Sequence, residues 1–134
     1  MPLTLPARRR ALTTIGALTT LRFREPHFFA TAAALREWLE ENHDSADELS
    51  LGIYKKDSGK QPFTLQEAQD QAMCFGWVDS MSKGIDDVSY TLRFTPRKGR
   101  SKWNARNVAR AEELRDKGLM HDAGLRAFER RLDG

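Results

Sequence analysis

Residues 64–83, TLQEAQDQAMCFGWVDSMSK, carry the signals for a helix, for its end and for the strand that follows. Thr64 and Glu67 form a capping box, which predicts a helix over residues 65–74. Gly76 is the residue type that commonly ends a helix. Helical spacing predicts an inward stripe on this helix, made of Leu65, Ala68, Ala72 and Phe75.

A β-hairpin is expected directly after this helix. Residues 77–83 and 90–95 have strand character, and the polar loop 84–89 joins them. Pro96 ends the second strand because proline cannot continue a ladder of hydrogen bonds.

The register of this hairpin follows from its apolar side chains. Pairing Met81 with Leu92 and Asp79 with Phe94 buries more apolar surface than a slip by one residue, so we expect this pairing. It places the Asp79 carboxylate on the apolar face. There it must be paired, hydrogen-bonded or protonated with a raised pKa.

The remaining elements follow from helix caps and from the periodicity of apolar residues. Thr31 predicts the start of a helix over residues 32–42, and alternation over residues 49–56 predicts a strand. Two further helices are expected, one capped by Ser101 and running to about Lys117, the other over about 123–132 with Asp122 as its cap. The prediction is an α+β fold, a small, mostly antiparallel sheet of about three strands packed against about four helices.

Length and composition fit one domain. The chain has 134 residues and a single cysteine, so an internal disulfide framework is excluded. We assign residues 25–134 to the domain and interpret residues 1–24, with five arginines and no acid, as a basic N-terminal extension. A mobile arm or an upstream translation start is favoured over an export signal for this extension.

The charge is uneven although the net value is only +3. Between Asp87 and Glu112 there are seven bases and no acid, which makes this segment the most attractive one for an anion. We interpret five of these bases as an outward basic rim: Lys98, Arg100, Lys102, Arg106 and Arg110.

Periodicity places Trp103, Asn104 and Asn107 on the inward face of the helix expected after Ser101, where the two amides need hydrogen-bond partners. Their amides either hold a neighbouring loop in place or, together with Asp79, line a polar pocket inside the basic rim, and both roles are compatible. The N-terminus of that helix, with its free N–H groups, is a reasonable anion site. The candidate ligand-binding residues are Trp77, Asp79, Arg93, Arg97, Ser101, Trp103, Asn104 and Asn107.

Four motifs occur in order: LGIYKKDSGK (51–60), CFGWVD (74–79), RFTPR (93–97) and SKWNARN (101–107). Together they resemble the bacterial YdeI/OmpD-associated family, also called bacteriocin-protection proteins, over about residues 28–128. Ser80 and Asn104 depart from the glycine and serine that are usual in that family. The resemblance implies a link to antimicrobial-peptide tolerance and envelope stress. It brings no established enzymatic activity, cofactor or catalytic residue.

Three function classes follow. The leading hypothesis is a binding module for an anionic small ligand or a protein partner, acting in stress tolerance. The alternatives are binding of nucleic acid or polyphosphate by the basic segment 93–110, and an enzyme with a polar pocket around Asp79. His27, His43 and His121 lack metal-ligand spacing, so we expect neither a metal nor a cofactor.

Hydropathy predicts no membrane-spanning segment, because no apolar run approaches about 18 residues. The expected location is the cytoplasm. The periplasm is the alternative that the resemblance suggests for some family members.

Overall fold

The computed structural model describes residues 25–98 and 103–132. Within these residues it contains three strands and four α-helices, which confirms the predicted α+β class. The predicted N-terminal extension, residues 1–24, lies outside them. The strands are β1 (Leu49–Tyr54), β2 (Trp77–Gly84) and β3 (Ser89–Pro96), and the helices are α2 (Ala32–Asn42), α3 (Leu65–Cys74), α4 (Ala105–Asp116) and α5 (Asp122–Arg130), with a short 3₁₀ helix, η2 (Lys56–Ser58), after β1.

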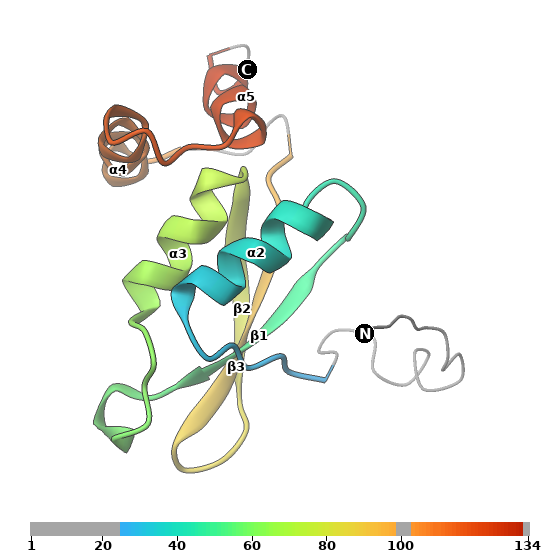
Figure 1. Cartoon of the computed structure of the whole chain (residues 1–134), viewed down its shortest axis with the longest axis vertical. Coiled ribbons are helices and arrows are strands. Elements are labelled where there is room, and N and C mark those ends of the chain that lie inside the picture. Colours follow the sequence, from blue (N-terminus) through green and yellow to red (C-terminus); the bar gives the residue numbers. More distant parts are fainter. Residues whose placement is uncertain (1–24, 99–102, 133–134) are drawn as a thin grey trace.

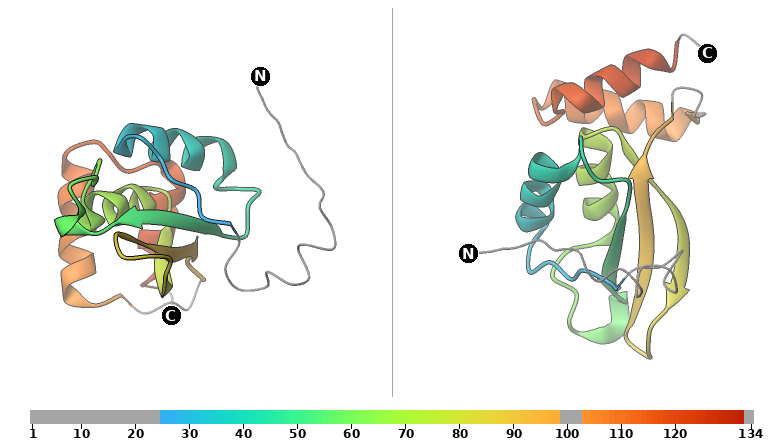
Figure 2. Two further views of the ribbon diagram at one scale, coloured as in Figure 1. Left: turned by 90° about the horizontal axis from the view of Figure 1, so that it is seen from below. Right: turned by 90° about the vertical axis from the view of Figure 1, so that its right-hand side faces the viewer.

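The sheet is antiparallel in the order β1-β3-β2. Helices α2 and α3 cover one of its faces, while α4 and α5 lie beyond one end of the sheet, near the point where α3 passes into β2 (Figures 1 and 2). The turn of the β2–β3 hairpin lies at the opposite end (Figure 1). The molecule therefore has a sheet–helix layer and a helical cap at one end.

Local sequence signals fix several element ends as predicted. Thr31 accepts a hydrogen bond from the Ala34 backbone N–H and caps α2. Thr64 and Glu67 form both hydrogen bonds of the capping box at the start of α3. Gly76 follows α3 with φ 78°, a left-handed conformation that glycine adopts without the steric cost of a Cβ.

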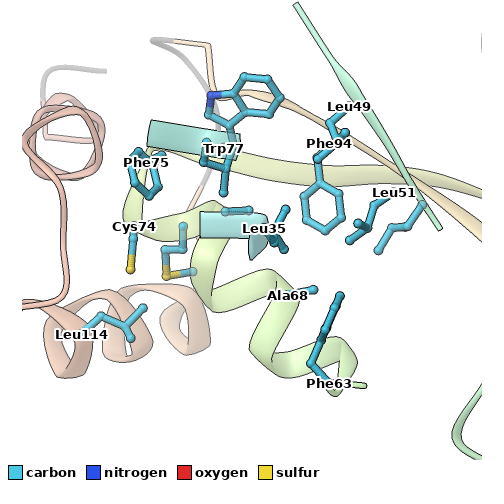
Figure 3. Close-up of a cluster of buried hydrophobic side chains, with 14 of the residues drawn as sticks. Leu35, Leu49, Leu51, Phe63, Ala68, Cys74, Phe75, Trp77, Phe94 and Leu114 are labelled. Atoms are coloured by element: carbon cyan, nitrogen blue, oxygen red, sulfur yellow. The ribbon is translucent and has the colours of Figure 1, made fainter. Parts of the chain in front are cut away.

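The core lies between the sheet and the two helices that cover it. Phe94 of β3 and Leu51 of β1 point from the sheet toward Leu35 and Ala68, and Trp77 lies beside them (Figure 3). At the cap end, Leu114 of α4 belongs to the same cluster. Because these side chains are almost fully buried, truncation of one large member to alanine should cost about 3–5 kcal/mol.

The cap is attached to α3 by a very close helix contact. A Cβ added to Gly124 of α5 would lie 2.2 Å from the carbonyl oxygen of Cys74. In addition, the His121 backbone N–H donates to that same oxygen at 2.9 Å. Helix α5 therefore approaches the end of α3 at a distance that only glycine permits.

The predicted hairpin register is correct at its start and wrong beyond a bulge. Asp79 pairs with Phe94 as expected, but Ser82, and not Met81, pairs with Leu92. A bulge between Asp79 and Ser82 adds one residue to β2 and shifts the alternation of its side chains. Met81 is consequently 37% exposed instead of buried.

Two predicted helix starts are also wrong. Helix α4 begins at Ala105, and not after Ser101, because the Asn104 side chain caps it by accepting from the Asn107 backbone N–H. Helix α5 begins at Asp122, with His121 as its cap in place of the predicted Asp122. In each case the capping side chain that forms the hydrogen bond sets the boundary.

Two smaller corrections concern β1 and α3. Strand β1 ends at Tyr54, two residues before the predicted end, because the chain then enters η2. Leu65 was expected on the inward stripe of α3, yet it is 36% exposed, since it occupies the first turn beyond the edge of the core.

Candidate functional site

A polar cleft lies among α3, the start of β2, the end of β3 and α4, with a volume of about 330 Å³. Met73, Trp77 and Phe94 contribute apolar surface to it, and most of the other lining residues are polar. Trp77 is only 2% exposed, so the cleft reaches down to the hydrophobic core. The polar and charged lining residues are Gln66, Gln69, Asp79, Arg97, Asn104, Arg106, Asn107, Arg110 and Glu113.

One wall of the cleft is held by an ion pair between α4 and α3. Arg110 donates from Nε to Asp70 Oδ1 at 2.9 Å and from Nη2 to Asp70 Oδ2 at 2.5 Å. Gln66 also donates to Asp70 Oδ1, at 2.9 Å. Arg110 completes its contacts with Glu113 Oε1 at 3.2 Å. The guanidinium is therefore fixed in orientation at the cleft wall.

The pKa directions agree with this geometry. Burial by itself would raise the pKa of Asp70, but hydrogen bonds from Arg110 and Gln66 and the charge of Arg110 outweigh it, so that this pKa is lowered. The hydrogen bond to Asp70 is the main reason why the pKa of Arg110 is raised. Both groups are charged near neutral pH.

Arg97 is the most buried cation of the cleft. It is 8% exposed, and its guanidinium carbon lies 3.9 Å from the centroid of the Trp103 ring. Its backbone N–H donates to the carbonyl oxygen of Gly76 at 2.8 Å. Burial lowers the pKa of Arg97, while the charge of Asp79 opposes that shift. Arg97 stays protonated, and its charge is held in a partly desolvated position.

Asp79 lies on the core-facing side of β2, opposite Phe94. Its carboxylate is half-buried, as expected from the register, and Gln69 Nε2 donates to Oδ2 at 3.5 Å. Burial, and secondly the charge of Asp79, raise the pKa of Tyr90. Asp79 therefore contributes a negative charge to the same cleft as Arg97.

The two asparagines differ in their roles. Asn104 was expected on the inward face of a helix, but it is the exposed N-cap of α4, with Oδ1 2.7 Å from the Asn107 backbone nitrogen. Asn107 lies in the first turn and is half-buried. Both residues line the cleft, so the cap and the cleft wall share one short segment.

The structure brings together five of the eight predicted ligand-binding residues: Trp77, Asp79, Arg97, Asn104 and Asn107. Arg93 is not among them, because it lies on the other side of β3 and pairs with Glu48 at 2.8 Å. Trp103 is not a lining residue either. Its ring packs edge-on against Phe128 and beneath Arg97.

Only two residues of the predicted basic rim are found at the cleft within the described part of the chain. Arg106 and Arg110 line the cleft, and Arg110 is an inward ion-pair partner instead of the outward residue expected from periodicity. Lys98 is exposed and does not line the cleft. Ser101, Arg100 and Lys102 lie outside the described residues.

Sequence reasoning missed the contribution of α3. Gln66, Gln69 and Asp70 recur at the i, i+3 and i+4 spacing that places side chains on one side of a helix. This polar stripe is a usable signal, because it lies beside the apolar stripe of the same helix and faces α4.

Cys74 is a core residue. It is buried near the end of α3, and burial raises the pKa of its thiol. Within residues 25–98 and 103–132, no three histidine, cysteine or acidic side chains are grouped as metal ligands would be. In the same part of the chain, no helix has the length and apolar character needed to cross a membrane.

The fold and the cleft thus define an α+β domain with a polar, mixed-charge cleft. Residues 27–127 match the family model described as a domain of unknown function (DUF8412), and the chain belongs to that family. No curated protein matches the chain. No solved structure matches it.

Proposed function

We propose that this domain is a small-ligand-binding module whose cleft binds a compound with an anionic group. The observation that carries the proposal is the convergence of Arg97, Arg106 and Arg110 in one cleft that reaches the apolar core. Small-ligand sites typically combine an apolar base with a few oriented polar groups, as this cleft does.

Arg106 is the residue best suited to bind the anion. Within the described part of the chain, its guanidinium makes one hydrogen bond, to Gln66 Oε1 at 3.4 Å, and no carboxylate pairs with it. By contrast, Arg110 is engaged by Asp70. Arg106 therefore retains donors for a ligand, while Arg110 adds positive charge from a fixed position.

The nucleic-acid alternative is less well supported by this geometry. Arg93, Arg97 and Arg110 are used in contacts within the domain, and Trp103 packs against Phe128 instead of presenting a face for base stacking. Nonspecific nucleic-acid binding needs exposed cations that can neutralise several phosphates. These contacts remove three of the seven bases from that role.

The enzyme alternative finds no cysteine or histidine in the described lining of the cleft. The Cys74 thiol is buried with a raised pKa, and no histidine lines the cleft around Asp79. The link to antimicrobial-peptide tolerance, and a cytoplasmic location, stay predictions that rest on the sequence.

The test is calorimetric titration and thermal shift of the full chain with short-chain carboxylates and inorganic phosphate. We expect saturable binding that Arg106→Gln and Asn107→Ala weaken by about tenfold or more, because hydrogen bonds to charged groups contribute about 1.5–3 kcal/mol. Arg126→Gln, at an exposed position of α5, is the matched control and should bind as the wild type does. Binding that Arg106→Gln and Arg126→Gln reduce equally would show that overall charge, and not the cleft, attracts the anion.

A further inference from the structure

The cleft combines donor groups and carboxylates from different elements. Helix α4 contributes the two donors Arg106 and Asn107, whereas β2 contributes the carboxylate Asp79. The second carboxylate of the cleft, Glu113, already accepts from Arg110 and is largely exposed. Asp79 is therefore the principal acceptor that the cleft offers to a ligand.

The carboxylate of Asp79 can accept more hydrogen bonds than it does within the described residues. A carboxylate can accept about four hydrogen bonds. Within the described residues, Asp79 accepts one from a side chain, at the long distance of 3.5 Å from Gln69 Nε2. A half-buried carboxylate with so few hydrogen-bond donors is costly. The charge of Arg97 already acts on Asp79, and a ligand ammonium group would add the missing hydrogen-bond donors.

The cleft base adds a third requirement. Met73, Trp77 and Phe94 line the cleft together with its charged groups and belong to the buried core. The volume of about 330 Å³ lies at the lower end of the range for small-ligand pockets, roughly 300–1,000 Å³. A ligand of amino-acid size, with both charges at one end and an apolar group at the other, matches this arrangement.

Building on the proposed function, we propose that the ligand is zwitterionic, namely a free α-amino acid with an apolar side chain. Its carboxylate binds Arg106 and Asn107 on α4, its ammonium group binds Asp79 on β2, and its side chain contacts Trp77. This assigns Asp79 the role of distinguishing an amino acid from a simple carboxylic acid.

The experiment compares three matched ligands by calorimetric titration of the full chain at neutral pH. Leucine has both charges, 4-methylpentanoate lacks the amine, and 3-methylbutylamine lacks the carboxylate. We expect leucine to bind at least about tenfold more tightly than either, because hydrogen bonds to a charged group contribute about 1.4 kcal/mol or more. Asp79→Asn should reduce the preference for leucine over 4-methylpentanoate to less than about threefold, while Asp87→Asn, an exposed acid in the hairpin loop, should leave it unchanged.

A ligand-side variant covers the case in which Asp79→Asn does not fold. N-acetyl-leucine, which keeps the carboxylate and loses the ammonium charge, should bind wild-type protein as weakly as 4-methylpentanoate. Equal binding of leucine and 4-methylpentanoate would overturn the zwitterion proposal and leave an anion site. Binding of 3-methylbutylamine as tight as that of leucine would overturn both proposals, and so would an absence of binding by all carboxylates and phosphate.

Discussion

Arg110 of α4 donates two hydrogen bonds to the carboxylate of Asp70 on α3, joining residues 40 positions apart in the sequence. This pair connects the helical cap to the layer that covers the sheet, and Arg110 also lines the cleft. Its contribution should therefore appear in both stability and binding.

The Asp70–Arg110 pair predicts a pH dependence of stability. Because the pKa of Asp70 in the folded state is lower than its ordinary value of 3.8, the unfolded state binds more protons, and stability rises with pH in that range. The stabilisation is fully present above the unfolded pKa and is lost as pH falls through the folded pKa. Asp70→Asn should cost about 1–2 kcal/mol at about pH 6, a difference that shrinks toward about pH 3.

Urea unfolding of wild type and Asp70→Asn at a series of pH values measures this difference. Asp44→Asn, an exposed carboxylate after α2, serves as the control and should follow the wild-type curve. A constant difference between wild type and Asp70→Asn down to about pH 3 would show that the charge of Asp70 does not stabilise the fold.

The side chain of Asn104 should stabilise the fold as the N-cap of α4. Asn104→Ala removes the N-cap of α4 and should lower the free energy of unfolding by about 1 kcal/mol, whereas Asn104→Ser should restore most of it, since serine is an equivalent cap. Chemical denaturation measures both. If Asn104→Ser is as unstable as Asn104→Ala, the Asn104 side chain has another essential contact.

Gly124 predicts a strong steric effect. The Cβ of Gly124→Ala would lie 2.2 Å from the Cys74 carbonyl oxygen, so α5 must move, at an expected cost of about 1–3 kcal/mol. Gly84→Ala, where an added Cβ meets nothing within 4 Å, should change stability by less than about 0.5 kcal/mol. Thermal unfolding of the two variants compares them directly, and equal melting temperatures would contradict the tight helix contact.

Cys74 predicts an unreactive thiol. It is buried, and burial raises the pKa of its thiol, so little thiolate is available to attack a disulfide reagent. We expect at least about a hundredfold slower labelling by a chromogenic disulfide in native buffer than in denaturant. Fast native labelling would mean that the end of α3 opens readily, and it would reopen Cys74 as a functional residue.

The parts of the fold that sequence predicted well are those determined by neighbouring residues. The capping box of Thr64 and Glu67 and the left-handed Gly76 need only a few adjacent positions, and both appear as expected. The start of the predicted hairpin register is also confirmed, because Asp79 pairs with Phe94.

The features that could not be predicted from the sequence depend on contacts between residues far apart in the chain. The bulge in β2 shifted Met81 outward, and nothing in the alternation of β2 marks that bulge. Helical spacing predicts that Arg110 faces solvent, because the apolar residues of its helix define an inward sector that excludes it. In the structure, the position of the Arg110 side chain is set by its ion pair with Asp70 on another helix. Likewise, Arg93 left the candidate site because Glu48 binds it on the opposite side of the sheet.

The segment from Cys74 to Trp77 has a practical consequence for engineering this domain. Its Cys74 carbonyl anchors α5, its Gly76 carbonyl accepts from Arg97, and Trp77 begins β2 opposite Pro96. A spectroscopic label or an inserted peptide at this junction would disturb the cap, strands β2 and β3 and the cleft together. The loop Gly84–Ser89 is the better attachment point, because it lies at the far end of the hairpin and most of it is exposed (Figure 1).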